Sequence, residues 1–200
     1  ILILYPLTHY VLLNNKKYNT YDVNKKLYII KNIIKSLLLC YLTFDSINLV
    51  YGMYYNTWNN AHLNRFASLY VSNDIMGLLM IPKLPRSTKI HHVITTILLL
   101  YSFTVDFTKD NVGRLLFILC LFSSYSFLVN LYLGLRHLRT TENNILNNVI
   151  EKIRKSSYYI YMVCCFLNWS IQLSIICYKA YFNTLTYQYF IYPWFLIFII

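Results

Sequence analysis

The sequence has few charged residues and very little glycine or proline. Charged side chains make up 12% of the 200 residues, about half of the roughly 25% found in soluble domains. Hydrophobic residues reach 58%, more apolar surface than a soluble domain of this length can bury. Four Gly and four Pro exclude collagen-like and low-complexity chains, and an aromatic content of 18% excludes intrinsic disorder. The composition therefore predicts an integral membrane protein.

The five cysteines form no pattern that binds metal or builds a disulfide framework. Each lies in an apolar stretch, and no two are spaced as C-x-x-C. Zinc sites and small disulfide-rich folds use such pairs. We expect buried free thiols, no metal site and no resident cofactor.

Five runs have the apolar character and approximate length of a membrane-spanning helix, about 20 residues. They are the segments 36–55, 66–81, 90–105, 115–135 and 156–178. The apolar ends 1–13 and 189–200 are expected to be pieces of further spans, cut from a longer protein. No run alternates with the period of two that a transmembrane β-barrel requires. The sequence predicts an all-α, polytopic transmembrane bundle of about six to seven spans, forming one domain over residues 1–200.

Basic residues are concentrated in three of the predicted loops. Fourteen of the 18 Lys and Arg residues lie in the loops 14–35, 82–89 and 136–155. The positive-inside rule makes these loops cytoplasmic and places residue 1 on the lumenal or exterior side. Scattered loop charges of this kind do not form the basic face of a nucleic-acid-binding module, so we expect no nucleic-acid partner. The segment 142–155 is expected to form a short amphipathic helix on the membrane surface.

Four ionisable residues lie inside or at the mouth of predicted spans. They are Asp45, Asp74, His91 and His92. A charged group at the centre of a span costs at least about 2.5–3.5 kcal/mol, so such residues are candidates for function, or for hydrogen bonds between helices. The short connection between 66–81 and 90–105 predicts antiparallel neighbours. We therefore expect Asp74 to approach the histidines.

This combination suits acid–base or acyl-transfer chemistry. A histidine can act as general base or nucleophile while a carboxylate behind it orients the ring and stabilises its cation. Adjacent helical positions point about 100° apart, so His91 and His92 are not expected to aim at one atom. His92 shares a helix face with Thr95 and Thr96. The alternative is that the histidines are interfacial and Asp74 only bonds a neighbouring helix.

Two stretches of this region resemble a known family. Tyr-Val-Ser-Asn-Asp-Ile-Met at 70–76 is followed by a short basic loop and Lys-Ile-His-His-Val-Ile-Thr-Thr at 89–96. This arrangement resembles the TLC domain, a multi-pass membrane domain shared by ceramide synthases and the translocating-chain-associating membrane protein. The resemblance is strongest over 70–96. It implies a role in lipid metabolism, lipid sensing or control of membrane composition, in the endoplasmic reticulum or another endomembrane, with membrane lipids as partners.

The resemblance also implies site residues and leaves two functions open. His91, His92 and Asp74 would be catalytic, and four further residues would contact substrate: Tyr70, Lys89, Thr95 and Asn130. One function is an acyl-CoA-dependent lipid N-acyltransferase, with acyl-CoA as co-substrate and its phosphates bound by the basic loop. The other is a non-enzymatic protein that binds or senses lipids, or acts as a scaffold. The segment 119–126 lacks the two Asp residues of ceramide synthases, which favours the second function.

Overall fold

The computed structural model describes residues 1–140, 144–189 and 192. All regular structure within these residues is helical, as predicted. The helices are α1 (Leu4–Leu12), α2 (Lys16–Asn19), α3 (Val23–Tyr54), α4 (Asn60–Met80), α5 (Arg86–Ser102), α6 (Gly113–Tyr125), α7 (Phe127–Leu135), the 3-10 helix η1 (Arg136–Leu138) and α8 (Asn144–Tyr181).

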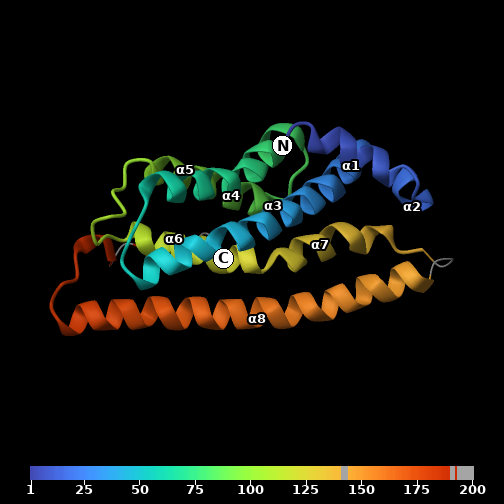
Figure 1. Cartoon of the computed structure of the whole chain (residues 1–200). Coiled ribbons are helices and arrows are strands. Elements are labelled where there is room, and N and C mark those ends of the chain that lie inside the picture. Colours follow the sequence, from blue (N-terminus) through green and yellow to red (C-terminus); the bar gives the residue numbers. More distant parts are fainter. Residues whose placement is uncertain (141–143, 190–191, 193–200) are drawn as a thin grey trace.

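The helices form a layered bundle (Figure 1). The long helix α8 lies along one edge, and α6 and α7 pack between it and α3. Helices α4 and α5 pack against each other on the side away from α8, with α4 also on α3. Helix α3 therefore contacts elements of both halves of the molecule. Buried leucine and phenylalanine side chains of α3, α4 and α6 form one core cluster, including Leu42, Phe66 and Phe117.

Helix α3 begins thirteen residues before the predicted span 36–55, so the expected loop 14–35 is wrong. The Asp22 side chain caps the helix by accepting a hydrogen bond of 2.8 Å from the backbone N–H of Lys25. From Leu27 on, most residues are apolar, and Lys31 and Lys35 interrupt them at the i,i+4 spacing of one helix face. The predicted span begins at residue 36 because the uncharged run begins there, after Lys35. The helix itself continues through both lysines.

The predicted span 115–135 is two helices, α6 and α7, which meet at a bend of 46°. The break contains neither proline nor glycine, but it follows a run of serines. The Ser124 hydroxyl bonds the Leu121 carbonyl, and the Ser126 hydroxyl bonds the Phe122 carbonyl. Serine hydroxyls compete in this way with the regular helical bonds and bend helices. The Thr43 hydroxyl of α3 shares its proton between the Leu39 carbonyl of its own helix at 2.9 Å and the Ser124 carbonyl at the bend at 3.1 Å.

Helix α8 replaces two predicted elements. The expected surface helix 142–155 and the span 156–178 form one uninterrupted helix of 38 residues from Asn144 to Tyr181. At 1.5 Å per residue it is about 57 Å long, nearly twice the roughly 30 Å of a bilayer's hydrocarbon core. The charged first turns of α8 therefore continue the helix of the apolar span and do not form a separate helix.

Within residues 1–140, 144–189 and 192, two or three helices are long and apolar enough to span a membrane, fewer than the predicted six to seven. By length and composition α3 and α8 qualify, and the bent pair α6–α7 makes a third if it is one span. Helix α5 has 17 residues and α1 has nine, which is short for a span. Helix α4 is long enough but rich in Asn, Ser and other polar residues. Most of the predicted piece 189–200 lies outside the described residues.

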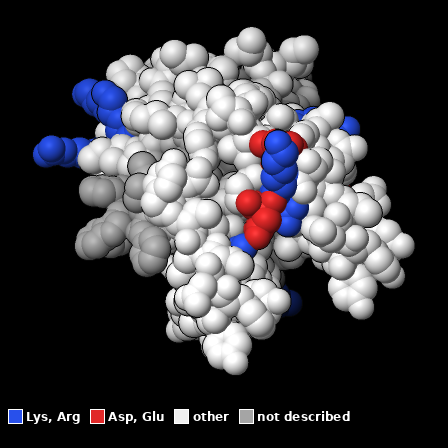
Figure 2. All heavy atoms as spheres, turned by 90° about the vertical axis from the view of Figure 1, so that its left-hand side faces the viewer, with Lys and Arg blue, Asp and Glu red and all other residues white. Residues whose placement is uncertain are grey.

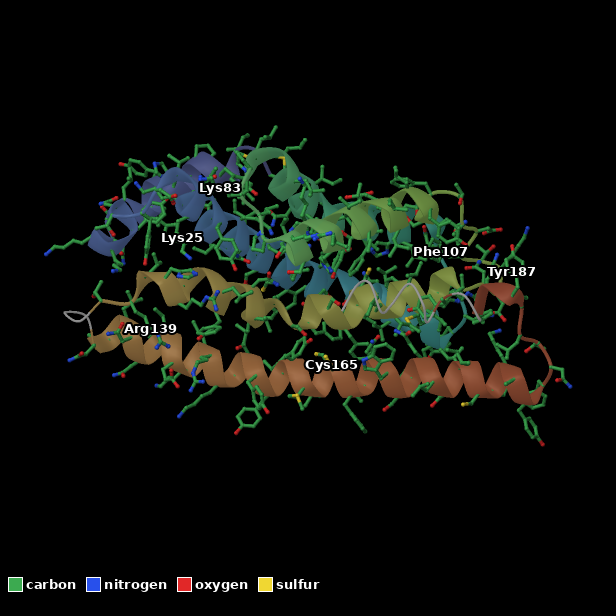
Figure 3. The ribbon with its side chains drawn as sticks, turned by 180° about the vertical axis from the view of Figure 1, so that it is seen from behind. Lys25, Lys83, Phe107, Arg139, Cys165 and Tyr187 are labelled. Atoms are coloured by element: carbon green, nitrogen blue, oxygen red, sulfur yellow. The ribbon has the colours of Figure 1, made fainter. Side chains whose placement is uncertain are left out.

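The two ends of the bundle differ in charge. Figure 3 shows Lys25 and Arg139 at one end, with Lys83 toward the same side, and Phe107 and Tyr187 at the opposite end. Figure 2 looks at the end on the left of Figure 1, which carries only a few charged groups on a largely uncharged surface. The three basic segments of the sequence thus lie toward one end of the molecule.

Candidate functional site

Four ionisable residues from three helices meet inside the bundle. Lys31 and Lys35 come from α3, Asp74 from α4 and His92 from α5, and each is at most 6% exposed. We call these four residues the Asp74 cluster. Lys35 Nζ donates a hydrogen bond of 3.0 Å to Asp74 Oδ2, and His92 Nδ1 lies 3.4 Å from Asp74 Oδ1. The predicted approach of Asp74 to a histidine is present.

His92 also faces a second partner, Lys31. The Lys31 Nζ atom lies 2.6 Å from His92 Nε2. A lysine ammonium has only donors, so with Lys31 charged the Nε2 atom is the acceptor and the ring proton sits on Nδ1, toward Asp74. Nδ1 lies close to Asp74 but outside hydrogen-bond geometry, and we regard this contact as electrostatic. The order of contacts is Lys35, Asp74, His92, Lys31.

Tyr70 holds Lys35 in place. The Lys35 ammonium donates a hydrogen bond of 2.6 Å to the Tyr70 backbone carbonyl. It also lies 4.3 Å from the centre of the Tyr70 ring, within the range of a cation–π contact. Lys35 is thus fixed between Tyr70 and Asp74, one helical turn apart on α4.

His91 lies beside this cluster and is half-buried. Its ring centre is 5.6 Å from that of His92, and the ring planes are inclined by 63°. One nitrogen of each ring and one Asp74 oxygen lie within 4.8 Å of one another. The three polar residues of the motif therefore converge on one region.

This trio is a poor metal site in its present form. Lys31 and Lys35 already occupy atoms of His92 and Asp74. Two ammonium groups in these positions would repel a divalent cation.

The Asp74 cluster lines a cavity of about 450 Å³. This volume is within the range of pockets that hold one small ligand, about 300–1,000 Å³. Six of the seven predicted site residues line it: Tyr70, Asp74, His91, His92, Thr95 and Asn130. Thr95 turns its hydroxyl to the backbone carbonyl of His92 at 3.0 Å. Lys89, the seventh predicted residue, has an exposed side chain and does not line the cavity.

Several lining residues were missed by sequence reasoning. Lys31 and Lys35 were assigned to a loop, although their i,i+4 spacing within an apolar run was a usable signal. Helix α8 contributes a polar and aromatic strip to the wall: Tyr161, Cys164, Cys165, Asn168 and Trp169. These residues recur every three to four positions, and so lie on one face of α8.

Asp45, the remaining polar candidate within a span, has a different environment. Its carboxylate lies 3.1 Å from His62 Nε2 and 2.6 Å from a guanidinium nitrogen of Arg65. Both partners lie on α4. This group connects α3 to α4 near the start of α4, away from the cavity lining. It supports the alternative that some intramembrane polar residues hold helices together.

No family model, no curated protein and no solved structure matches this chain. The geometry of the cavity is therefore the basis for any functional conclusion.

Proposed function

We propose that this protein is a multi-pass membrane protein, similar to TLC-domain proteins, that binds a membrane lipid inside its helical bundle. Its role would be lipid binding, sensing or control of membrane lipid composition. The observation that carries the proposal is the cavity of about 450 Å³, which the Asp74 cluster lines together with apolar and aromatic side chains. Buried ionisable residues facing an interior cavity commonly mark the path or site of a ligand in membrane proteins.

Orientation and location belong to the same proposal. The end that carries Lys25, Lys83 and Arg139 (Figure 3) would face the cytoplasm, as the positive-inside rule requires. The location would be the endoplasmic reticulum or another endomembrane. A lumenal or exterior residue 1 would in addition require a membrane crossing before α2, for which the nine residues of α1 are short. Lys31 and Lys35 are buried and so do not contribute to the surface charge that sets orientation.

An acyl-CoA-dependent lipid N-acyltransferase is the second candidate. It is favoured by Asp74, whose carboxylate lies 3.4 Å behind His92, the arrangement that orients a general base. In such a reaction a lipid amine forms an N–C bond to the acyl carbon while the C–S bond breaks. The base takes the amine proton, and the coenzyme leaves as its thiol. Against it, His92 Nε2 already faces Lys31, and the acidic residues expected near 119–126 are missing.

The proposed lipid site can be tested by a substitution that fills part of the cavity. Ala67 lines the cavity, so Ala67→Trp is expected to occupy part of it and remove bound lipid. Leu37→Trp, on an exposed part of α3, is the matched control. Mass spectrometry of lipid that copurifies with each protein should show loss only for Ala67→Trp. Equal lipid content in the two variants and the wild type would contradict a lipid site in this cavity.

Replacing the two histidines distinguishes the two candidate functions. An assay with acyl-CoA and a long-chain amine should show product with the wild type and none with His91→Ala/His92→Ala if the protein is a transferase. Bound lipid without any product supports the binding protein. If neither bound lipid nor product changes in the double variant, both assignments of the histidines are wrong.

A further inference from the structure

The charges that line the cavity do not balance. Among the described lining residues there are two lysines, Lys31 and Lys35, and one carboxylate, Asp74. Lys35 donates a direct hydrogen bond of 3.0 Å to this carboxylate. The Lys31 ammonium contacts the uncharged ring nitrogen of His92, and the carboxylate whose charge acts on it, Asp74, is the one that Lys35 already binds. One buried ammonium therefore has no anion of its own.

An uncompensated ammonium is unfavourable at this position. Lys31 is 4% exposed, and moving an ammonium group out of water is unfavourable unless an anion pairs with it directly. Two arrangements remove the cost: Lys31 releases its proton, or an anion joins it. The second needs space beside the ammonium. Lys31 lines the cavity, so the space is present.

We propose that the cavity binds a single-chain amphiphile whose anionic head, a carboxylate or a phosphate, pairs with Lys31. This rests on the proposed lipid-binding function and names its ligand class. An ammonium has three donors, and His92 accepts one of them, which leaves donors for a ligand oxygen. His92 holds the ammonium on one side, and the ligand approaches it from the cavity.

The shape of the cavity fits an elongated ligand. Its lining on α5 runs from Thr88 to Ser102, about 21 Å of helix. It continues to Phe107, which Figure 3 shows at the end of the bundle opposite Lys25. The wall in this direction is mostly leucine and phenylalanine, among them Leu99, Leu116 and Phe117. An acyl chain can thus lie along the apolar part while its head stays at Lys31.

Gly77 of α4 makes room for the Lys31 side chain. A Cβ atom at position 77 would lie 3.1 Å from both Cδ and Cε of Lys31 and 3.5 Å from Nζ. The first two distances are tighter than ordinary carbon contacts of about 3.5–4.0 Å. Gly77→Ala therefore shifts the ammonium and keeps its charge, which provides a second variant besides removal of the lysine.

The test measures binding of three 16-carbon probes to the full chain in zwitterionic nanodiscs: the fatty carboxylate, the matching alcohol and the matching amine. The wild type should bind the carboxylate at least tenfold more tightly than the other two. Lys31→Met should weaken carboxylate binding by about ten- to a hundredfold, the range for a hydrogen bond to a charged group. Lys152→Met, an exposed lysine of α8, should leave it unchanged.

Further arms make the outcome decisive. Gly77→Ala should weaken carboxylate binding severalfold with little effect on the alcohol, and a 16-carbon phosphate monoester should compete with the carboxylate. Inorganic phosphate alone should not compete, because it lacks the chain. Equal binding of the carboxylate and the alcohol, or preference for the amine, would overturn the anionic head and leave the lipid-binding cavity standing. No binding of any probe, with no copurified lipid, would overturn both.

Discussion

Lys31 Nζ lies 2.6 Å from His92 Nε2, and this contact joins α3 to α5 in the interior of the bundle. It also determines what His92 can do. The nitrogen that would accept a proton from a substrate is turned to an ammonium group, and the other nitrogen faces Asp74. A histidine held in this way is suited to orienting Lys31. We therefore regard Lys31, which the sequence did not single out, as the central residue of the site.

Asp74→Asn should destabilise the protein strongly. The change removes the one carboxylate among the described lining residues and leaves two buried ammonium groups near a neutral amide. Removing one partner of a buried ion pair costs about 3–5 kcal/mol. Unfolding in detergent, followed by helical circular dichroism, should show the loss.

A matched control for this variant is available on α3. Asp22 caps the helix by accepting the Lys25 N–H, and asparagine caps helices as well as aspartate does. Asp22→Asn should therefore change stability by little. Similar stability of Asp74→Asn and Asp22→Asn would show that the buried carboxylate is not needed to balance the lysines.

Thr43→Val should weaken the bend between α6 and α7. The Thr43 hydroxyl shares its one proton between the Leu39 carbonyl of its own helix at 2.9 Å and the Ser124 carbonyl across the helix interface at 3.1 Å. Loss of a hydrogen bond of this kind costs about 0.5–1.5 kcal/mol. Thr104 is exposed, and its hydroxyl donates only a local hydrogen bond to the Tyr101 carbonyl. Thr104→Val should therefore lower the stability less. The same denaturation experiment measures both, and equal losses would argue against the role of Thr43 at the bend.

The loop between α5 and α6 should loosen in acid. Hydrogen bonds from Asn60 and Thr108 lower the pKa of Asp106 from 3.8 to about 2. Because the pKa is lower in the folded protein, this stabilisation is present above about pH 3.8 and is lost as the pH falls toward 2. Hydrogen exchange of the loop amides, corrected for the intrinsic rate, should therefore rise over this interval.

Asn60→Ala provides the control for this interval. It removes the first cause of the lowered pKa and also the acceptor for the Phe107 N–H. The variant loop should exchange faster than the wild type at neutral pH and change less between pH 4 and 2. A wild-type loop whose corrected exchange is flat over this range would contradict the role of Asp106.

The proposed orientation can be checked by labelling cysteines from each side of sealed vesicles. Lys17→Cys and Lys152→Cys lie on exposed positions at α2 and the start of α8, and a reagent that does not cross membranes should reach them from the cytoplasmic side. Lys109→Cys, in the loop between α5 and α6, should react only from the other side. Labelling of Lys17→Cys and Lys109→Cys from the same side would contradict the topology.

The approach of Asp74 to His92 could be predicted because a short loop makes their helices antiparallel neighbours. The lysine partners could not be found in the same way. A lysine in an apolar run is normally read as the end of a span, and its burial becomes understandable only with Asp74 on another helix. Conversely, Lys89 is next to the motif in sequence, but it lies in the first turn of α5, where a long charged side chain stays in water at little cost.

The helix count was overestimated for a related physical reason. A run of apolar residues indicates that a segment is shielded from water. It does not indicate whether lipid or other helices of the protein shield it. Helix α4 carries Asn73 and Asp74 as fully or almost fully buried residues, and its partners α3 and α5 supply the cover. The long α8 is predicted as two elements because the charged residues of its first turns indicate a surface helix, separate from the apolar span that follows.

Photo-crosslinking with a fatty acid that carries a light-activated group near the end of its chain tests the central claim most directly. If the head pairs with Lys31 and the chain lies in the cavity, adducts should map to lining residues such as Leu99, Leu116 and Phe117. Excess unlabelled fatty acid should suppress them. Adducts confined to outward-facing residues of α8, such as Phe166 and Tyr178, would contradict the account.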